Sequence, residues 1–158
     1  KVECVLVGGA VVAVYSKGAY RSGDLDLIVE KSALAITQAV LESLGFHKTR
    51  GRHYEHPECE HLIIEFPPGP ISIGDDYKIN PDEVIVEGKK LKIFSPTDCI
   101  RDRLASYIHF KARECLDQAI LVARQQPFKL NKIREWCTKE GASEAFEEFS
   151  RLLKGRPQ

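Results

Sequence analysis

Two acidic residues separated by one leucine are the residues of this sequence best suited to carry out chemistry. Asp24 and Asp26 lie in the segment 24–29, where the remaining residues are apolar. Side chains alternate along a β-strand, so both carboxylates should share one face, with their Cα atoms about 7 Å apart. Two carboxylates placed in this way can bind one divalent cation, or two cations about 4 Å apart. The pattern therefore predicts a metal site on a strand.

The residues before these two acids predict the elements that position them. Residues 2–7 form a short β-branched run that ends at Gly8-Gly9, which is typical of a buried strand followed by a turn. Residues 10–15 are small and apolar, as in a short helix packed on that strand. Residues 21–23 then turn the chain into the strand of the two aspartates.

This arrangement resembles the nucleotidyltransferases of the DNA polymerase beta superfamily. Their signature is an apolar strand ending in Gly-Gly or Gly-Ser, a short helix, and an Asp-apolar-Asp-apolar strand, here Gly8-Gly9 and residues 24–27. The similarity is greatest to the small prokaryotic members, including those of abortive-infection toxin type. One difference is Ala10, which follows the glycines where a hydroxyl residue is common.

The resemblance implies both a fold and a reaction. The fold is α+β: a nucleotidyltransferase-like mixed sheet with flanking helices in residues 1–94, followed by a C-terminal helical segment in residues 95–158, the two packed as one unit. The reaction is transfer of an NMP group from an NTP to a hydroxyl acceptor, with release of pyrophosphate. Asp24 and Asp26 would hold two Mg²⁺ (or Mn²⁺) ions.

The resemblance also implies a third catalytic carboxylate on a later strand, and Glu65 is the candidate. Glu65 lies within the apolar strand predicted over residues 61–66, where a glutamate is costly to bury unless it is paired or bound to a metal. Asp75 and Asp76, in a glycine-containing loop, are the alternatives for this position. Glu65 could also be an acid on an edge strand that faces the solvent.

The nucleotide-binding residues follow from the same resemblance. Gly8 and Gly9 would let the backbone approach the phosphates, where a Cβ would obstruct. Arg21 and Ser22 would line the triphosphate, and so would Arg103, which stands where lysine is usual and binds phosphate as a planar fork. The partners implied are a nucleoside triphosphate, with ATP among the candidates, and an acceptor left open between protein, RNA and a small molecule.

Two other hypotheses stay open at this point. Because no Ser or Thr follows Gly9, the chain could be a catalytically inactive nucleotidyltransferase-fold module that binds nucleotide or acts as an antitoxin-like partner. Asp24 and Asp26 could also only cap a turn, although that would leave the glycine pair and Glu65 unexplained. The oligomeric state is undetermined.

Composition limits the class of protein. The chain has 158 residues, of which 43% are hydrophobic and 29% charged, as in a globular domain and unlike a disordered chain. The 23 basic and 23 acidic residues cancel, which does not indicate a strongly basic nucleic-acid binder. Residues 101–134 hold eight Lys or Arg against three acids, an excess that could face an anionic substrate or simply the solvent.

Cysteine content and hydropathy bear on location. The five cysteines are odd in number and contain no CxxC pair, which is typical of free thiols in a reducing cytoplasm. The longest apolar run, residues 4–15, is too short to span a bilayer. We therefore expect a cytoplasmic protein with no membrane span.

A cluster of potential metal ligands lies in the middle of the chain. His53, His56, Cys59 and His61 fall within nine residues, a set that could bind zinc. Their spacing fits no usual zinc pattern. A zinc site here is left open.

The middle of the chain predicts one helix and further strands. Ser32 is expected to cap a helix over residues 33–44, which Gly45 ends and which should cover one face of the sheet. Two short antiparallel strands should flank Gly51. A hairpin is expected about Gly88-Lys89.

From Ser95 onward the pattern predicts only helices. Ser95, Pro96 and Asp98 combine a cap, a proline at the first helical position and an acid in the first turn. We expect Asn131 to cap a later helix and Ser143 to open the last one.

Overall fold

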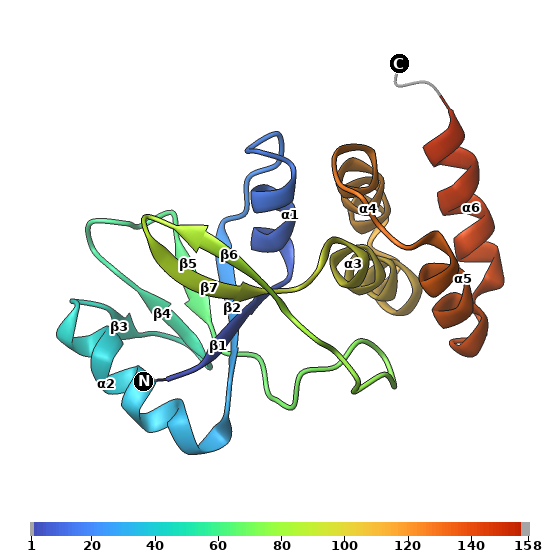
Figure 1. Cartoon of the computed structure of the whole chain (residues 1–158). Helices are drawn as coiled ribbons and strands as arrows, with labels where there is room; N and C mark the ends of the chain where they lie inside the picture. The colour runs from blue at the N-terminus through green and yellow to red at the C-terminus, as the bar shows by residue number, and fades with distance from the viewer. Residues whose placement is uncertain (1, 156–158) are drawn as a thin grey trace.

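The computed structural model describes residues 2–155, in which a mixed seven-stranded sheet is flanked by helices (Figure 1). The strands lie in the order β3-β4-β5-β2-β1-β7-β6. The pairs β1–β7 and β2–β5 are parallel and the others antiparallel. This is the expected α+β class. The strands are β1 (Cys4–Val7), β2 (Asp24–Val29), β3 (His47–Lys48), β4 (His53–Glu55), β5 (Ile63–Glu65), β6 (Asp82–Val86) and β7 (Lys89–Ile93).

Two helices and a short 3₁₀ turn are interleaved with the strands, and four more helices follow them beside the sheet (Figure 1). They are α1 (Gly9–Tyr15), η1 (Lys31–Ala33), α2 (Leu34–Ser43), α3 (Pro96–Phe110), α4 (Arg113–Gln125), α5 (Leu130–Lys139) and α6 (Ser143–Lys154). In the described part of the chain, no helix combines the length and apolar character needed to cross a bilayer. All five cysteines are free thiols.

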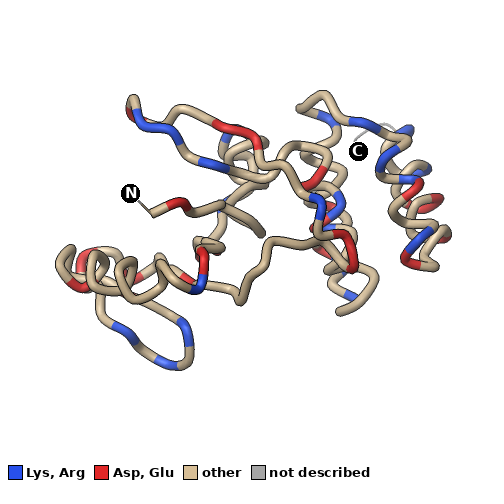
Figure 2. The backbone as a smooth tube through the Cα atoms, turned by 60° about the horizontal axis from the view of Figure 1, so that its bottom comes forward, with Lys and Arg blue, Asp and Glu red and all other residues tan. Residues whose placement is uncertain are grey.

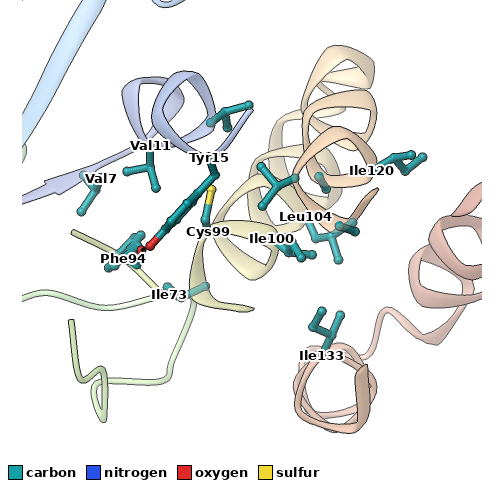
Figure 3. Close-up of a cluster of buried hydrophobic side chains, with 14 of the residues drawn as sticks. Val7, Val11, Tyr15, Ile73, Phe94, Cys99, Ile100, Leu104, Ile120 and Ile133 are labelled. Carbon is teal, nitrogen blue, oxygen red and sulfur yellow. Dashed lines mark hydrogen bonds between the residues drawn. The ribbon is translucent and has the colours of Figure 1, made fainter. Parts of the chain in front are cut away.

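The larger hydrophobic core joins the sheet to the helical segment (Figure 3). Val11 of α1, Phe94 after β7, Ile100 of α3 and Ile133 of α5 are all buried in it. The Tyr15 hydroxyl donates to the Phe94 carbonyl at 2.7 Å, so α1 is tied to the chain just before α3. Residues on both sides of Ser95 therefore share one core.

A smaller core lies under α2. Tyr54 of β4 and Ile64 of β5 are buried there, with Leu34 and Leu41 of α2 packed against them. Side chains alternate, so this is the face of β4 and β5 opposite His53 and Glu65. As expected, α2 covers one face of the sheet, but it does so incompletely, and Val40 is 50% exposed. The strands β3, β4 and β5 are only two or three residues long, so they offer little apolar surface to the helix.

Two of the predicted helix caps are wrong. Ser32 lies inside η1 and its hydroxyl donates to Glu30 Oε2 at 3.4 Å, while α2 begins after Ala33. Asn131 lies inside α5, which begins one residue earlier. There the Lys129 N–H donates to Thr97 Oγ1 at 3.0 Å, a contact across 32 residues that supports the start of the helix in place of a local cap.

The other predicted starts of helices are confirmed. The Ser95 hydroxyl accepts the Asp98 N–H at 3.1 Å and donates to Asp98 Oδ2 at 2.8 Å, and Pro96 opens α3. Ser143 is the first residue of α6.

The predicted hairpin is present, but its turn lies one residue earlier than expected. Glu87 and Gly88, with φ of 49° and 74°, connect β6 and β7. Two-residue hairpin turns of this hand need positive φ at both central positions. Gly88 adopts positive φ at no steric cost, whereas residues with a Cβ, such as Glu87, rarely do so.

Candidate active site

The three predicted acids lie on neighbouring strands at the centre of the sheet. β2 runs parallel to β5, with Asp24 beside Ile63 and Asp26 beside Glu65. Because side chains alternate and laterally paired residues share a face, the three carboxylates project from the same face. Asp24 is exposed, whereas Asp26 and Glu65 are partly buried.

Gly8 packs directly against Asp26. Its φ is +72°, a conformation that side chains with a Cβ rarely adopt, and a Cβ at this position would collide with Asp26 Oδ2. The site therefore requires glycine here for two reasons: the backbone conformation and the close approach of the carboxylate.

Gly9 lies next to Ser22, which contacts the other aspartate, Asp24. A Cβ on Gly9 would lie 2.9 Å from Ser22 Oγ and 3.3 Å from Tyr20 Oη. The Ser22 hydroxyl in turn donates to Asp24 Oδ1 at 2.8 Å and so orients that carboxylate. The glycine pair, Ser22 and the two aspartates thus form one continuous surface. Tyr20 lies in the irregular α1–β2 connection, where no motif marked it in the sequence.

Negative charge is concentrated on this surface. The pKa of Asp26 is raised to about 6, first by burial and then by the charges of Asp24 and Glu65. The Arg103 guanidinium acts in the opposite direction, and Asp102 adds a further upward contribution. Carboxylates crowded in this way favour binding of a cation.

Arg103 is within electrostatic range of Asp26, but its own contacts are with the helical segment. Its guanidinium donates to Asp102 Oδ2 at 2.7 Å and to Gln118 Oε1 at 3.4 Å. Asp102 was not among the predicted site residues, because its position depends on how α3 packs against the sheet. Arg21 is exposed on the loop before β2.

On the side of β4, the Glu65 carboxylate lies within ion-pair distance of two basic side chains. The antiparallel β4–β5 register places His53 beside Glu65, with His53 Nε2 3.3 Å from Oε2 and Arg52 Nη2 3.4 Å from Oε1. The alternative of an edge-strand acid is wrong, because β5 lies between β4 and β2. Sequence reasoning did not include Arg52 and His53 in the site, although the hairpin register would have placed them there.

The alternative third ligands contact the helical segment instead. Asp76 pairs with Arg101 of α3, and the Asp75 N–H donates to Glu140 Oε1 at 3.4 Å. These contacts hold the loop over residues 71–78 against α3 and α5. Glu65 is therefore the better candidate for the third carboxylate.

The donor set is chemically suited to a hard divalent cation. Asp24, Asp26 and Glu65 offer only oxygen ligands, which Mg²⁺ and Mn²⁺ prefer, and together they carry an excess of negative charge. Within residues 2–155, no three or more His, Cys, Asp and Glu side chains form a group closed enough to hold a metal ion. Glu65 instead contacts Arg52 and His53.

The histidines considered for zinc have other neighbours. The His56 ring lies 5.0 Å from the Phe46 ring, and its Nδ1 accepts the Glu58 N–H at 3.0 Å. His53 contacts Glu65. Both side chains therefore have packing or electrostatic roles in the sheet.

Solved structures of similar fold are nucleotidyltransferases. The solution structure of the antibiotic-resistance factor ANT(2'')-Ia has a TM-score of 0.53 and 14% identity, covering 97% of this chain and 82% of that one. Its crystal structure in complex with adenylyl-2''-tobramycin has a TM-score of 0.54 and 12% identity, covering 96% and 88%. An antigenic nucleotidyltransferase-like protein from Paracoccidioides brasiliensis has a TM-score of 0.58 and 16% identity, covering 92% and 84%.

These similarities establish a nucleotidyltransferase fold. At such low identities they do not establish the reaction. No protein-family model matches the sequence, and no curated protein does.

Proposed function

We propose that this chain is an enzyme that transfers an NMP group from an NTP to a hydroxyl acceptor and releases pyrophosphate. The observation that carries the proposal is the placement of Asp24, Asp26 and Glu65 on one face of adjacent strands, beside Gly8. The fold of nucleotidyltransferases supports it, and one neighbour is solved with an adenylylated product, which favours ATP as the nucleotide. The toxin-like subtype and a cytoplasmic location stay predictions from the sequence.

Asp24, Asp26 and Glu65 would hold Mg²⁺ or Mn²⁺, which when bound neutralises triphosphate charge and lowers the pKa of a hydroxyl nucleophile. The chain itself prepares the ligands. Ser22 fixes the Asp24 carboxylate through its 2.8 Å hydrogen bond, and Gly8 leaves room for Asp26. The exposed Asp24 and the partly buried Asp26 are thus both positioned by neighbouring residues.

The remaining residues bind the nucleotide and move the proton. Gly8 and Gly9 would let the backbone approach the phosphate oxygens, which a Cβ would obstruct. The exposed Arg21 would offset the charge of the triphosphate, and Arg103 would do so after exchanging its present partner Asp102. As the acceptor oxygen bonds to the α-phosphorus and pyrophosphate leaves, Glu65 accepts the proton of the acceptor hydroxyl.

One observation favours a second candidate, a nucleotide-binding module without turnover. Glu65 is engaged by Arg52 and His53, so its carboxylate must exchange these partners before it can serve in the reaction. The absence of a hydroxyl side chain after Gly9 points the same way. Such a module would bind Mg²⁺ and NTP but release no pyrophosphate.

Pyrophosphate release distinguishes the two candidates. We expect the wild-type protein, incubated with Mg²⁺, each NTP and a mixture of acceptors, to release pyrophosphate, and Asp24→Ala/Asp26→Ala to show only background. Asp75→Asn is the matched control, because this exposed acid lies in the loop over residues 71–78, and it should keep full activity. Release undiminished in the double variant would contradict the assignment, and nucleotide binding without release would favour the module.

A further inference from the structure

A short, strongly basic hairpin lies next to the candidate catalytic acid Glu65. The segment His47–His53 comprises β3, the turn that follows and the first residue of β4, and it contains Lys48, Arg50 and Arg52 but no acidic residue (Figure 2). We call it the basic hairpin. The side chains of its three Lys and Arg residues are exposed.

The basic hairpin is an ordered turn, not a loose loop. The Thr49 N–H donates to the His53 carbonyl at 3.0 Å, and the His53 N–H donates to the Arg50 carbonyl at 3.3 Å. Thr49 Oγ1 also donates to Glu55 Oε1 at 3.0 Å. These bonds therefore fix the backbone of the turn relative to β4 and β5.

This hairpin reaches the candidate site through Arg52 and His53. Both contact the Glu65 carboxylate, at 3.4 Å and 3.3 Å. Arg50, in the turn, has no carboxylate within ion-pair distance among the described residues, so its charge is available to a ligand. Lys48 is paired with Tyr54, whose side chain lies in the core under α2, so Lys48 projects from the face opposite Glu65.

The other basic region of the chain is engaged internally. Arg101 pairs with Asp76 and Asp98, and Lys132 also reaches Asp98 at 3.2 Å. Arg103 pairs with Asp102. The Lys and Arg excess in residues 101–134 is therefore largely used within the protein.

We propose that the basic hairpin binds the acceptor, and that the acceptor bears phosphate next to its reactive hydroxyl. The inference rests on the proposed function, in which Glu65 receives the proton of that hydroxyl. The chemical group next to that hydroxyl would then lie close to Arg52 and the rest of the basic hairpin. Phosphate fits this position because exposed arginine and lysine side chains bind it. A nucleic-acid end and a small phosphorylated sugar share this chemistry, whereas a cationic acceptor is disfavoured.

Binding of a labelled ten-nucleotide single-stranded RNA, measured by fluorescence anisotropy without metal, tests the proposal. Arg50→Glu should weaken binding by about threefold or more and lower the slope of log Kd against log salt by about 0.7, since one phosphate contact is lost. Arg50 does not contact Glu65. Lys89→Glu is the matched control: a charge reversal on the hairpin β6–β7, at the opposite side of the sheet, should alter binding less than about 1.5-fold.

Competition by ribose 5-phosphate identifies the source of the phosphate. Displacement of the RNA indicates a small phosphorylated acceptor, and its failure to compete indicates a polynucleotide, and either result supports the proposal. No RNA binding by the wild-type protein, or equal loss in Arg50→Glu and Lys89→Glu, overturns it.

The same proteins separate this proposal from the proposed function. Arg50→Glu should bind Mg²⁺-ATP as the wild type does, and both variants should melt at the wild-type temperature. If pyrophosphate release fails in the wild type while RNA binding still depends on Arg50, the proposed reaction is wrong and the hairpin's phosphate binding stands.

Discussion

Asp26→Asn is expected to lower pyrophosphate release by about 100-fold or more while making the metal-free protein more stable. Asp26 is crowded by Asp24 and Glu65, and asparagine keeps the shape of the side chain while removing one repelling charge. Asp26 is only partly buried, so solvent screening limits the gain to about 1 kcal/mol, or about 2 to 4 °C in Tm. Such a trade-off is typical of groups kept for function.

Differential scanning calorimetry without metal, alongside the pyrophosphate assay, checks both halves of this prediction. Asp75→Asn should change neither activity nor Tm appreciably. If Asp26→Asn lowered the Tm, Asp26 would have a stabilising structural partner. Unchanged activity would remove Asp26 from the catalytic set.

Arg101→Ala should have the largest effect on stability, a loss of about 3 to 5 kcal/mol in the free energy of unfolding. The Arg101 side chain is only 1% exposed, donates to Asp98 Oδ1 at 2.8 Å and stacks over the Trp136 ring at 5.6 Å. Its loss leaves the buried Asp98 carboxylate with Lys132 as its remaining cation, at 3.2 Å. It also releases Asp76, and with it the loop over residues 71–78.

Urea denaturation followed by circular dichroism measures this loss. Lys132→Ala is the control at the same carboxylate, and it should cost about 1 kcal/mol, because Lys132 is 43% exposed. Arg101 joins the loop over residues 71–78 to α3 and α5. We therefore expect residues 1–94 and 95–158 to unfold together, in a single cooperative transition of the wild-type protein. A loss below about 1 kcal/mol for Arg101→Ala, or two separate transitions, would contradict this.

The parts of the fold that could be predicted are those with local causes. The run into Gly8-Gly9 and the alternation about Asp24 and Asp26 depend on neighbours in sequence, as does the cap at Ser95. Each is decided within a few residues by backbone conformation, side-chain alternation or one hydrogen bond.

The parts that were missed depend on contacts between distant segments. The start of α5 coincides with a hydrogen bond between Lys129 and Thr97, and no local pattern reports it. Arg52 meets Glu65 only through the β4–β5 register, and Asp102 comes near Asp26 only through the packing of α3. Apolar residues do recur at helical spacing along α2, but the sheet beneath this helix is too small to bury all of them.

Isothermal titration of ATP, with and without Mg²⁺, tests the central claim most directly, namely that Asp24 and Asp26 form a metal-dependent nucleotide site. We predict that Mg²⁺ tightens ATP binding to the wild-type protein by about tenfold or more, and that Asp24→Ala/Asp26→Ala loses this gain. ATP binding that is independent of Mg²⁺, or a gain that persists in the double variant, would contradict the account.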